Sequence, residues 1–120
     1  MGTRELVKKV QLYSGFSDSE SQVALEQMVD SLAKRLTDDE RKDFASQLPP
    51  ELQAIALTTI PLVDRRMDII DEFMETERID EPRAKKQVLS AWRALKNAIS
   101  PGEISDIKAQ LPNATAAMLV

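Results

Sequence analysis

Apolar residues recur along most of the chain at the three- and four-residue spacing that is typical of amphipathic helices. Leu6, Val10 and Tyr13 follow this spacing, and Gly15 after them can end the helix in the left-handed conformation. A second helix begins at the cap Ser17, and its apolar positions are spaced i, i+3, i+4, i+7 and i+11. They are Leu25, Met28, Val29, Leu32 and Leu36. Alternating runs of β-branched and aromatic residues, which would indicate strands, are absent.

The apolar pattern of this second helix returns later in the chain with the same spacing. Its positions are then Val88, Ala91, Trp92, Leu95 and Ile99. Gln47-Leu48-Pro49 also returns as Gln110-Leu111-Pro112, at an offset of 110 − 47 = 63 residues. Two acidic pairs keep this offset: Glu40 with Glu103, and Asp43 with Asp106. Because each copy of a repeat must bury the same face, the chain is predicted to contain two copies of one helical unit.

Capping boxes and prolines divide each copy into further helices. Thr37 and Glu40 have the spacing of a capping box, in which the hydroxyl accepts a backbone N–H and the carboxylate accepts the N–H of the cap residue. Ser100 and Glu103 repeat this arrangement in the second copy. The helices that follow should end at the Gln-Leu-Pro motifs, because the residue before a proline is pushed out of the helical conformation.

Short fourth helices should follow, from Pro50 in the first copy and over 114–120 in the second, where Asn113 is the expected cap. The copies meet at 58–61, where Pro61 should start the next helix. We predict an all-α fold, a tandem-repeat helical bundle of about seven to eight helices with approximate internal twofold symmetry. It forms a single domain, 1–120, made of repeat one (1–60) and repeat two (61–120), because sixty residues alone would be marginal.

Composition restricts the chemistry that the chain can perform. It has no cysteine and no histidine, which excludes disulfides, zinc–thiolate sites, imidazole bases and histidine metal ligands. Its three glycines are isolated, so a phosphate-binding loop is not expected. The net charge of −4 argues against a general nucleic-acid-binding surface. We therefore expect a protein that is not an enzyme and that has no cofactor and no metal site.

Charge is sharply separated in the second copy. No acid occurs from 83 to 102, whereas 64–81 is strongly acidic. On a helix, four cations fall on one arc beside the apolar stripe, and Trp92, expected in the core or its seam, lies near their edge. We name these cations the basic ridge: Lys85, Lys86, Arg93 and Lys96. The ridge could bind phosphate or an acidic protein, but we favour internal pairing with 64–81 across an antiparallel hairpin.

The repeated motif has a structural and a functional interpretation. Its glutamines, Gln47 and Gln110, could present amides to a partner. The structural interpretation is favoured, because Leu48 and Leu111 can pack and the prolines can end helices. In it, each glutamine bonds the free carbonyls at its own helix end.

Carboxylates cluster around one predicted helix of the second copy, at Asp68, Asp71, Glu72 and Glu75. A metal site or carboxylate-based enzyme around Glu72 and Glu75 is the weakest of the functional hypotheses, because helix-bundle metal sites also use histidine. A solvated or ion-paired face is favoured. At the other end of this copy, the apolar segment 114–120 would favour self-association if it did not dock on its own bundle.

The order of these elements resembles the bacterial domain of unknown function 2267 family. The resemblance covers essentially the whole chain and rests on 47–52 in the first copy and on 100–103 with 110–112 in the second. It implies an all-helical tandem repeat in a bacterial protein, and no established activity, cofactor or catalytic residue. The second copy departs from the pattern after Pro112, where Asn113 and Ala114 stand in place of Pro-Glu.

The preferred function is a non-catalytic helical interaction or scaffold module, with a protein partner or a second copy of itself. The alternative is nucleic-acid or polyanion binding through the 82–99 helix. Residues expected to contact a partner are Lys85, Lys86, Trp92, Arg93 and Lys96. The first residues carry charges where a secretory signal needs an apolar run, and no stretch approaches membrane-spanning length, so a cytoplasmic location is expected.

Overall fold

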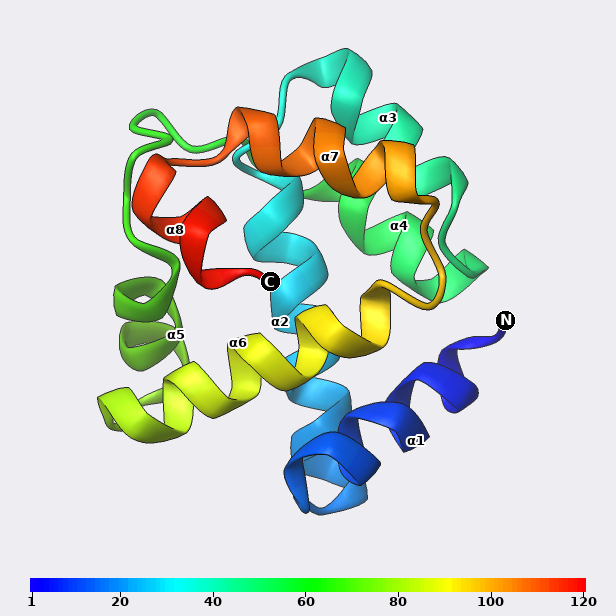
Figure 1. The fold of residues 1–120 in the computed structure, drawn as a ribbon, viewed down its shortest axis with the longest axis vertical. Helices are drawn as coiled ribbons and strands as arrows, with labels where there is room; N and C mark the ends of the chain where they lie inside the picture. Colours follow the sequence, from blue (N-terminus) through cyan, green and yellow to red (C-terminus); the bar gives the residue numbers. More distant parts are fainter.

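A computed structural model describes residues 1–120 as eight α-helices without a strand, which confirms the all-α prediction (Figure 1). The helices are α1 (Thr3–Ser14), α2 (Asp18–Ala33), α3 (Asp38–Ser46), α4 (Pro50–Thr58), α5 (Ile69–Glu77), α6 (Glu81–Leu95), α7 (Pro101–Gln110) and α8 (Asn113–Met118). Helices α1, α2 and α6 pack against one another, and α3, α4 and α7 lie together at one end of the molecule (Figure 1). None of the helices is long and apolar enough to span a bilayer.

Helix boundaries recur at the same offset as the sequence motifs. Helices α2, α3 and α4 begin at residues 18, 38 and 50, and α6, α7 and α8 begin at 81, 101 and 113. The differences 81 − 18, 101 − 38 and 113 − 50 all equal 63. Helices α1 and α5 end at 14 and 77, which differ by 63 as well. The local cause is the recurrence of cap residues, since each such start has a cap residue 63 positions from its counterpart.

One hydrophobic core connects the helices of both halves, from Leu6 in α1 to Leu119 beyond α8. The apolar stripe predicted for α2 is fully buried. Its counterpart in and after α6 is also buried, with at most 5% of any residue exposed. Gly15 adopts the left-handed conformation at φ 78° and ends α1, and Phe16 folds back into the interior, as the spacing predicts.

The prediction that Pro61 starts a helix is wrong. The chain between α4 and α5, residues 59–68, is not helical, and α5 begins only after Asp68. Two contacts favour this course. The backbone N–H of Leu62 donates to the carbonyl of Lys34 at the end of α2, and the Asp68 carboxylate accepts the N–H groups of Ile70 and Asp71. Asp68 is therefore the N-cap of α5, and a helix that ran from Pro61 through Asp68 would break this cap.

The last helix forms as expected and docks on the bundle. Pro112, and not Asn113, is its cap residue. Thr115 is 2% exposed and Leu119 is fully buried, so this segment packs on the core. The alternative of an undocked apolar tail is therefore wrong.

Candidate functional site

The third helix of each half starts at a hydroxyl cap, as predicted. Thr37 Oγ1 accepts the backbone N–H of Glu40 at 3.4 Å, and Ser100 Oγ accepts that of Glu103 at 3.2 Å. In a complete capping box, the glutamate carboxylates would accept the N–H groups of Thr37 and Ser100 in return. Those two N–H groups are bonded by other residues, so each capping box is only half formed.

The acceptors are the glutamines of the repeated motif, and each one reaches the opposite half of the molecule. Gln47 Oε1 accepts the N–H of Ser100 at 2.7 Å, and its Nε2 lies 3.4 Å from Ser100 Oγ. Gln110 Oε1 accepts the N–H of Thr37 at 2.9 Å, and its Nε2 lies 3.3 Å from Thr37 Oγ1. The interpretation that each glutamine bonds carbonyls of its own helix is wrong. We name these four bonds the glutamine exchange.

The other motif residues have the structural roles that the sequence predicts. Leu48 and Leu111 are 7% and 6% exposed and belong to the core. Pro49 and Pro112 follow the third helices and are the N-cap residues of α4 and α8. The motif is therefore a structural element that joins the two halves.

The glutamine exchange leaves the carboxylates of Glu40 and Glu103 without their capping role, and the two lie close together between α3 and α7. One carboxylate oxygen from each of Glu40, Asp43 and Glu103 lies within 4.8 Å of the other two. Glu103 is 5% exposed, and the Oε1 atoms of both glutamates have no hydrogen-bond partner. We name these three residues the carboxylate cluster.

Burial and like charge act together on this cluster. Burial, followed by the adjacent Glu40 and the charges of Asp43 and Asp106, raises the pKa of Glu103 to about 8. Sequence reasoning did not propose the cluster as a site. The available signal was the alignment of Glu40 with Glu103 at the repeat offset, since equivalent residues of two copies can meet where the copies pack against each other.

The carboxylates expected as a candidate metal site lie elsewhere and are neutralised. Glu72 is 6% exposed, with Oε1 2.8 Å from Arg35 Nη1 and Oε2 3.1 Å from Lys34 Nζ. Burial alone would raise the pKa of Glu72, but hydrogen bonds from Ser31 and Arg35 and the ion pair with Lys34 lower it overall. Glu75 is exposed. Because Glu72 is already ion-paired with two cations of the protein, Glu72 and Glu75 do not form a metal site in this structure.

The expected internal pairing of the basic ridge is wrong, because no ion pair links α6 to the acidic 64–81 segment. Lys85, Lys86 and Arg93 are exposed and form no ion pair at all. Lys96 is half-buried and donates to the backbone carbonyl of Val120. The physical reason is that the buried acid of α5, Glu72, faces Lys34 and Arg35, which follow α2, instead of the cations of α6.

Aromatic residues of α1 and its C-terminal turn lie beneath the exposed cations of α6. Arg93 Cζ is 4.0 Å from the ring centroid of Tyr13, and Lys86 Nζ is 5.4 Å from that of Phe16. Both distances fall in the range of cation–π contacts. Trp92 is only 1% exposed and lies in the core, which confirms its expected packing but removes it from the residues that can touch a partner.

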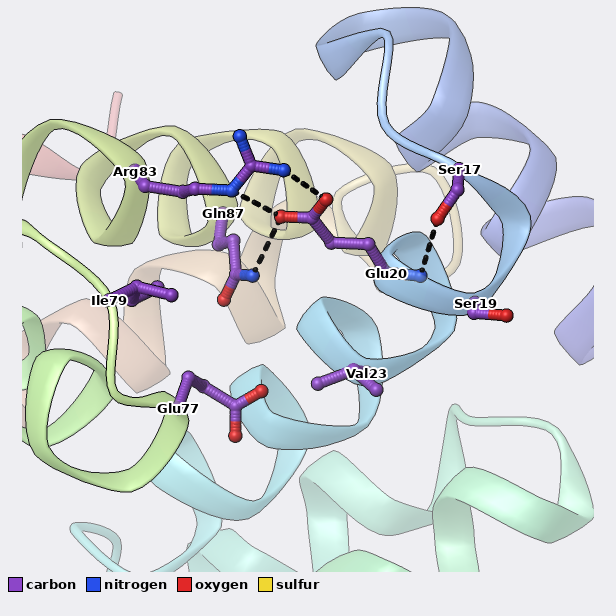
Figure 2. A pocket seen from close by; sticks show the side chains of 8 residues that line it. All are labelled: Ser17, Ser19, Glu20, Val23, Glu77, Ile79, Arg83 and Gln87. Atoms are coloured by element: carbon purple, nitrogen blue, oxygen red, sulfur yellow. Dashed lines mark hydrogen bonds and ion pairs between the residues drawn. The ribbon is translucent and has the colours of Figure 1, made fainter.

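A pocket of about 440 Å³ lies where α2 begins, α5 ends and α6 begins (Figure 2). Glu20 Oε2 accepts hydrogen bonds from Arg83 Nε at 2.8 Å and from Gln87 Nε2 at 3.2 Å. Glu77 faces this network, and burial raises its pKa. Val23 and Ile79 contribute the apolar lining. Because Arg83 and Glu20 neutralise each other, this side of the pocket holds a polar network without net charge.

These observations define the class of the protein as a small all-α bundle with one core, whose halves cap each other's helices. The chain belongs to the family described as "Uncharacterized conserved protein (DUF2267)", whose model matches residues 3–118. The match confirms the family resemblance of the sequence. No curated protein matches the chain.

Proposed function

We propose that the protein is a non-catalytic interaction module that binds an acidic segment of another protein. The binding surface is the basic–aromatic face: Lys85, Lys86 and Arg93 of α6, with Phe16 beneath Lys86 and Tyr13 beneath Arg93. The observation that carries the proposal is that these three cations are exposed and lack an internal ion-pair partner. Cations held over aromatic rings lose less side-chain freedom on binding than free surface lysines.

Charge favours a protein partner over a nucleic acid. The whole chain carries a net charge of −4, so a dense array of phosphates is repelled at long range. Nucleic-acid affinity is built from many phosphate contacts, and this face offers three exposed cations. A short acidic segment requires only a few ion pairs and can avoid the acidic remainder of the surface.

The proposal of a module without catalysis is supported by the side chains available. The chain has no histidine and no cysteine. The buried or half-buried acids Glu20 and Glu72 are held in ion pairs with arginine. In this proposal, the repeats 1–60 and 61–120 form one domain with approximate twofold symmetry, and the protein works in the cytoplasm.

The test is a fluorescence-anisotropy titration with a labelled oligoglutamate peptide at low salt. We expect binding that weakens with salt, and a loss of about tenfold or more in the variant Lys85→Ala/Lys86→Ala/Arg93→Ala, since each ion pair contributes up to about 1 kcal/mol. The matched control Lys42→Ala/Arg65→Ala/Lys108→Ala removes the same charge outside the face and should bind like the unmodified protein.

Four results would overturn this proposal. One is the absence of peptide binding at low salt, and another is equal binding by the two triple variants. The third is tighter binding to a DNA duplex than to the peptide, which would assign the face to the polyanion alternative. Self-association in analytical ultracentrifugation that only the α6 variant abolishes would assign the face to a second copy instead.

A further inference from the structure

We propose that Glu40, Asp43 and Glu103 form a binding site for a divalent cation of the Ca²⁺ type, between α3 and α7. These two helices run side by side at one end of the molecule (Figure 1). The site therefore joins the first half of the chain, which supplies two ligands, to the second half, which supplies one.

The geometry of the oxygens suits a single ion. One oxygen from each carboxylate lies within 4.8 Å of the other two. An ion that binds oxygen at about 2.3 to 2.6 Å can bridge separations of this size. Three carboxylate oxygens are hard ligands, which favour Ca²⁺, Mg²⁺ or Mn²⁺ over the metals that prefer nitrogen or sulfur. Water would complete the coordination shell on the side where Asp43 is exposed.

The second observation is the state of Glu103 itself. Only 5% of this residue is exposed, and its Oε1 has no hydrogen-bond partner. Oε1 of Glu40 also lacks a partner and is buried. When both carboxylates are ionised, these oxygens have lost the hydration that they have in water, and no donor group of the protein replaces it. Without a cation, only a proton held between Glu103 and Glu40 compensates them. A cation between the two glutamates would satisfy both oxygens.

No protein cation serves this purpose. None of the three carboxylates forms an ion pair, although Arg41 lies on the same helix. The Arg41 side chain is directed to Asp38 and to the carbonyls of Ala33 and Leu36. By contrast, the buried carboxylate of Glu72 forms ion pairs with two cations of the protein. The carboxylate cluster, which is buried at Glu103 and open to solvent at Asp43, is thus an acidic group without a cation of the protein beside it.

The glutamine exchange explains how the glutamates become available. Gln47 and Gln110 occupy the N–H groups that the two glutamates would otherwise accept. Both glutamates still lie in the first turn of their helices, where the helix dipole favours the ionised carboxylates that a cation requires. The two glutamines therefore cap the helices, and the two glutamates stay free to bind an ion.

The test uses the full chain, freed of metal with a chelator, in isothermal titration calorimetry and thermal unfolding with Ca²⁺, Mg²⁺ or Mn²⁺ at constant ionic strength. We expect one ion per chain, with a Kd for Ca²⁺ of about 10⁻⁴ to 10⁻³ M, as in sites with few protein ligands. Bound ion should raise the unfolding temperature in a concentration-dependent way.

Two variants and one matched control make the result specific. Glu103→Gln and Glu40→Gln should each weaken Ca²⁺ binding by at least about tenfold, because each removes one of three charged ligands. Above the pKa of Glu103, which is about 8, Glu103→Gln should also raise the unfolding temperature of the metal-free protein, since it removes the repulsion between ionised carboxylates. Asp39→Asn removes an exposed acid of the same helix and should leave Ca²⁺ binding unchanged.

The absence of binding by all three ions in the millimolar range would overturn the proposal. Wild-type affinity in Glu103→Gln would do so as well. If Asp39→Asn and Glu103→Gln weaken Ca²⁺ binding by a similar factor, ions are attracted diffusely to an acidic surface. That result would also overturn the proposal.

Discussion

Glu72 and Glu103 are both buried glutamates, and their surroundings have opposite charge. Arg35 and Lys34 surround Glu72, and Arg35 is itself fully buried and donates to the carbonyls of Ser31 and Met67. Around Glu103 stand other acids. The same residue type therefore prefers the ionised form at one site and the protonated form at the other.

Protonation of Glu103 predicts a fall in stability as pH rises. The folded protein keeps this proton up to a pKa of about 8, whereas the unfolded chain loses it near the ordinary value of 4.5. Between those values unfolding releases a proton, so the free energy of unfolding falls with rising pH, by up to about 1.4 kcal/mol per pH unit. Urea unfolding in metal-free buffers across this interval measures the slope.

The variant Glu103→Gln is the control for this measurement, because it lacks the carboxyl group that titrates. Its stability should fall less steeply than that of the unmodified chain over the same interval. Identical pH profiles for the two proteins would contradict the assignment of the slope to Glu103.

Removal of Arg35 should be strongly destabilising. The variant Arg35→Ala leaves Glu72 buried with one cation fewer and opens a cavity, and we expect a loss of about 3 to 5 kcal/mol in the free energy of unfolding. Chemical denaturation measures it. Arg66→Ala, which breaks an ion pair between exposed residues, serves as the control and should change stability little. Comparable losses in the two variants would show that burial does not set the effect.

At the scale of elements, helix starts were the best-predicted feature. Ser17, Thr37 and Ser100 all cap helices as the sequence indicates, because a hydroxyl followed by a helical pattern acts through local hydrogen bonds. Proline at a first helical position is also a local signal, yet the segment after Pro61 is not helical, and its Leu62 N–H donates to the carbonyl of Lys34, the residue that follows α2. Local sequence could not show that bond, since it depends on the tertiary fold.

The carboxylates of the capping boxes show the same limit. Glu20 lies three residues after the cap Ser17, which is the spacing of a capping box, but its carboxylate is directed to Arg83 and Gln87, more than 60 positions away in the chain. Likewise, the cation–π contact of Arg93 with Tyr13 joins helices at opposite ends of the sequence. The sequence pattern predicted that these residues lie in helices, but it did not show which other helix their side chains would contact.

The glutamine exchange should be measurable at the level of single helices. Gln47→Ala removes the acceptor of the Ser100 N–H, and we expect a loss of about 1 kcal/mol in stability and faster hydrogen exchange at that amide. Gln110→Ala should act in the same way at Thr37. NMR-detected hydrogen exchange reads both positions.

Each variant is the control for the other, because the two caps lie on different helices. Gln47→Ala should leave the Thr37 amide as protected as before. If the hydrogen-exchange rate of the Ser100 amide is unchanged in this variant, water satisfies that amide, and the bond from Gln47 does not stabilise α7.

At the scale of the whole molecule, the two halves are held together by their shared hydrophobic core and not by the chain segment that connects them. Residues 59–68 form the longest non-helical segment, and Ile60 and Val63 within it are 83% and 106% exposed. By contrast, side chains from α1 to the end of α8 contribute to a single buried cluster. The repeat indicated that two units exist, and the low stability expected of sixty residues alone indicated that they share a core.

Limited proteolysis should separate the role of the connection from that of the core. Trypsin should cut after Arg65 or Arg66, both exposed in this segment, and the two fragments should stay together in size-exclusion chromatography under native conditions. They should separate in denaturant. The variant Arg65→Gln/Arg66→Gln should resist this cut, and native separation of the fragments would show that the halves are independent domains.

The reciprocity of the glutamine exchange has a consequence for how such a fold can be assembled. Residues 1–60 contain both a glutamine that reaches outward and a Thr37 amide that awaits one. Each half therefore gives one cap and receives one, which is the exchange that two identical subunits of a dimer could make without a peptide link. Gene fusion of a self-pairing unit is a sufficient route to such an arrangement.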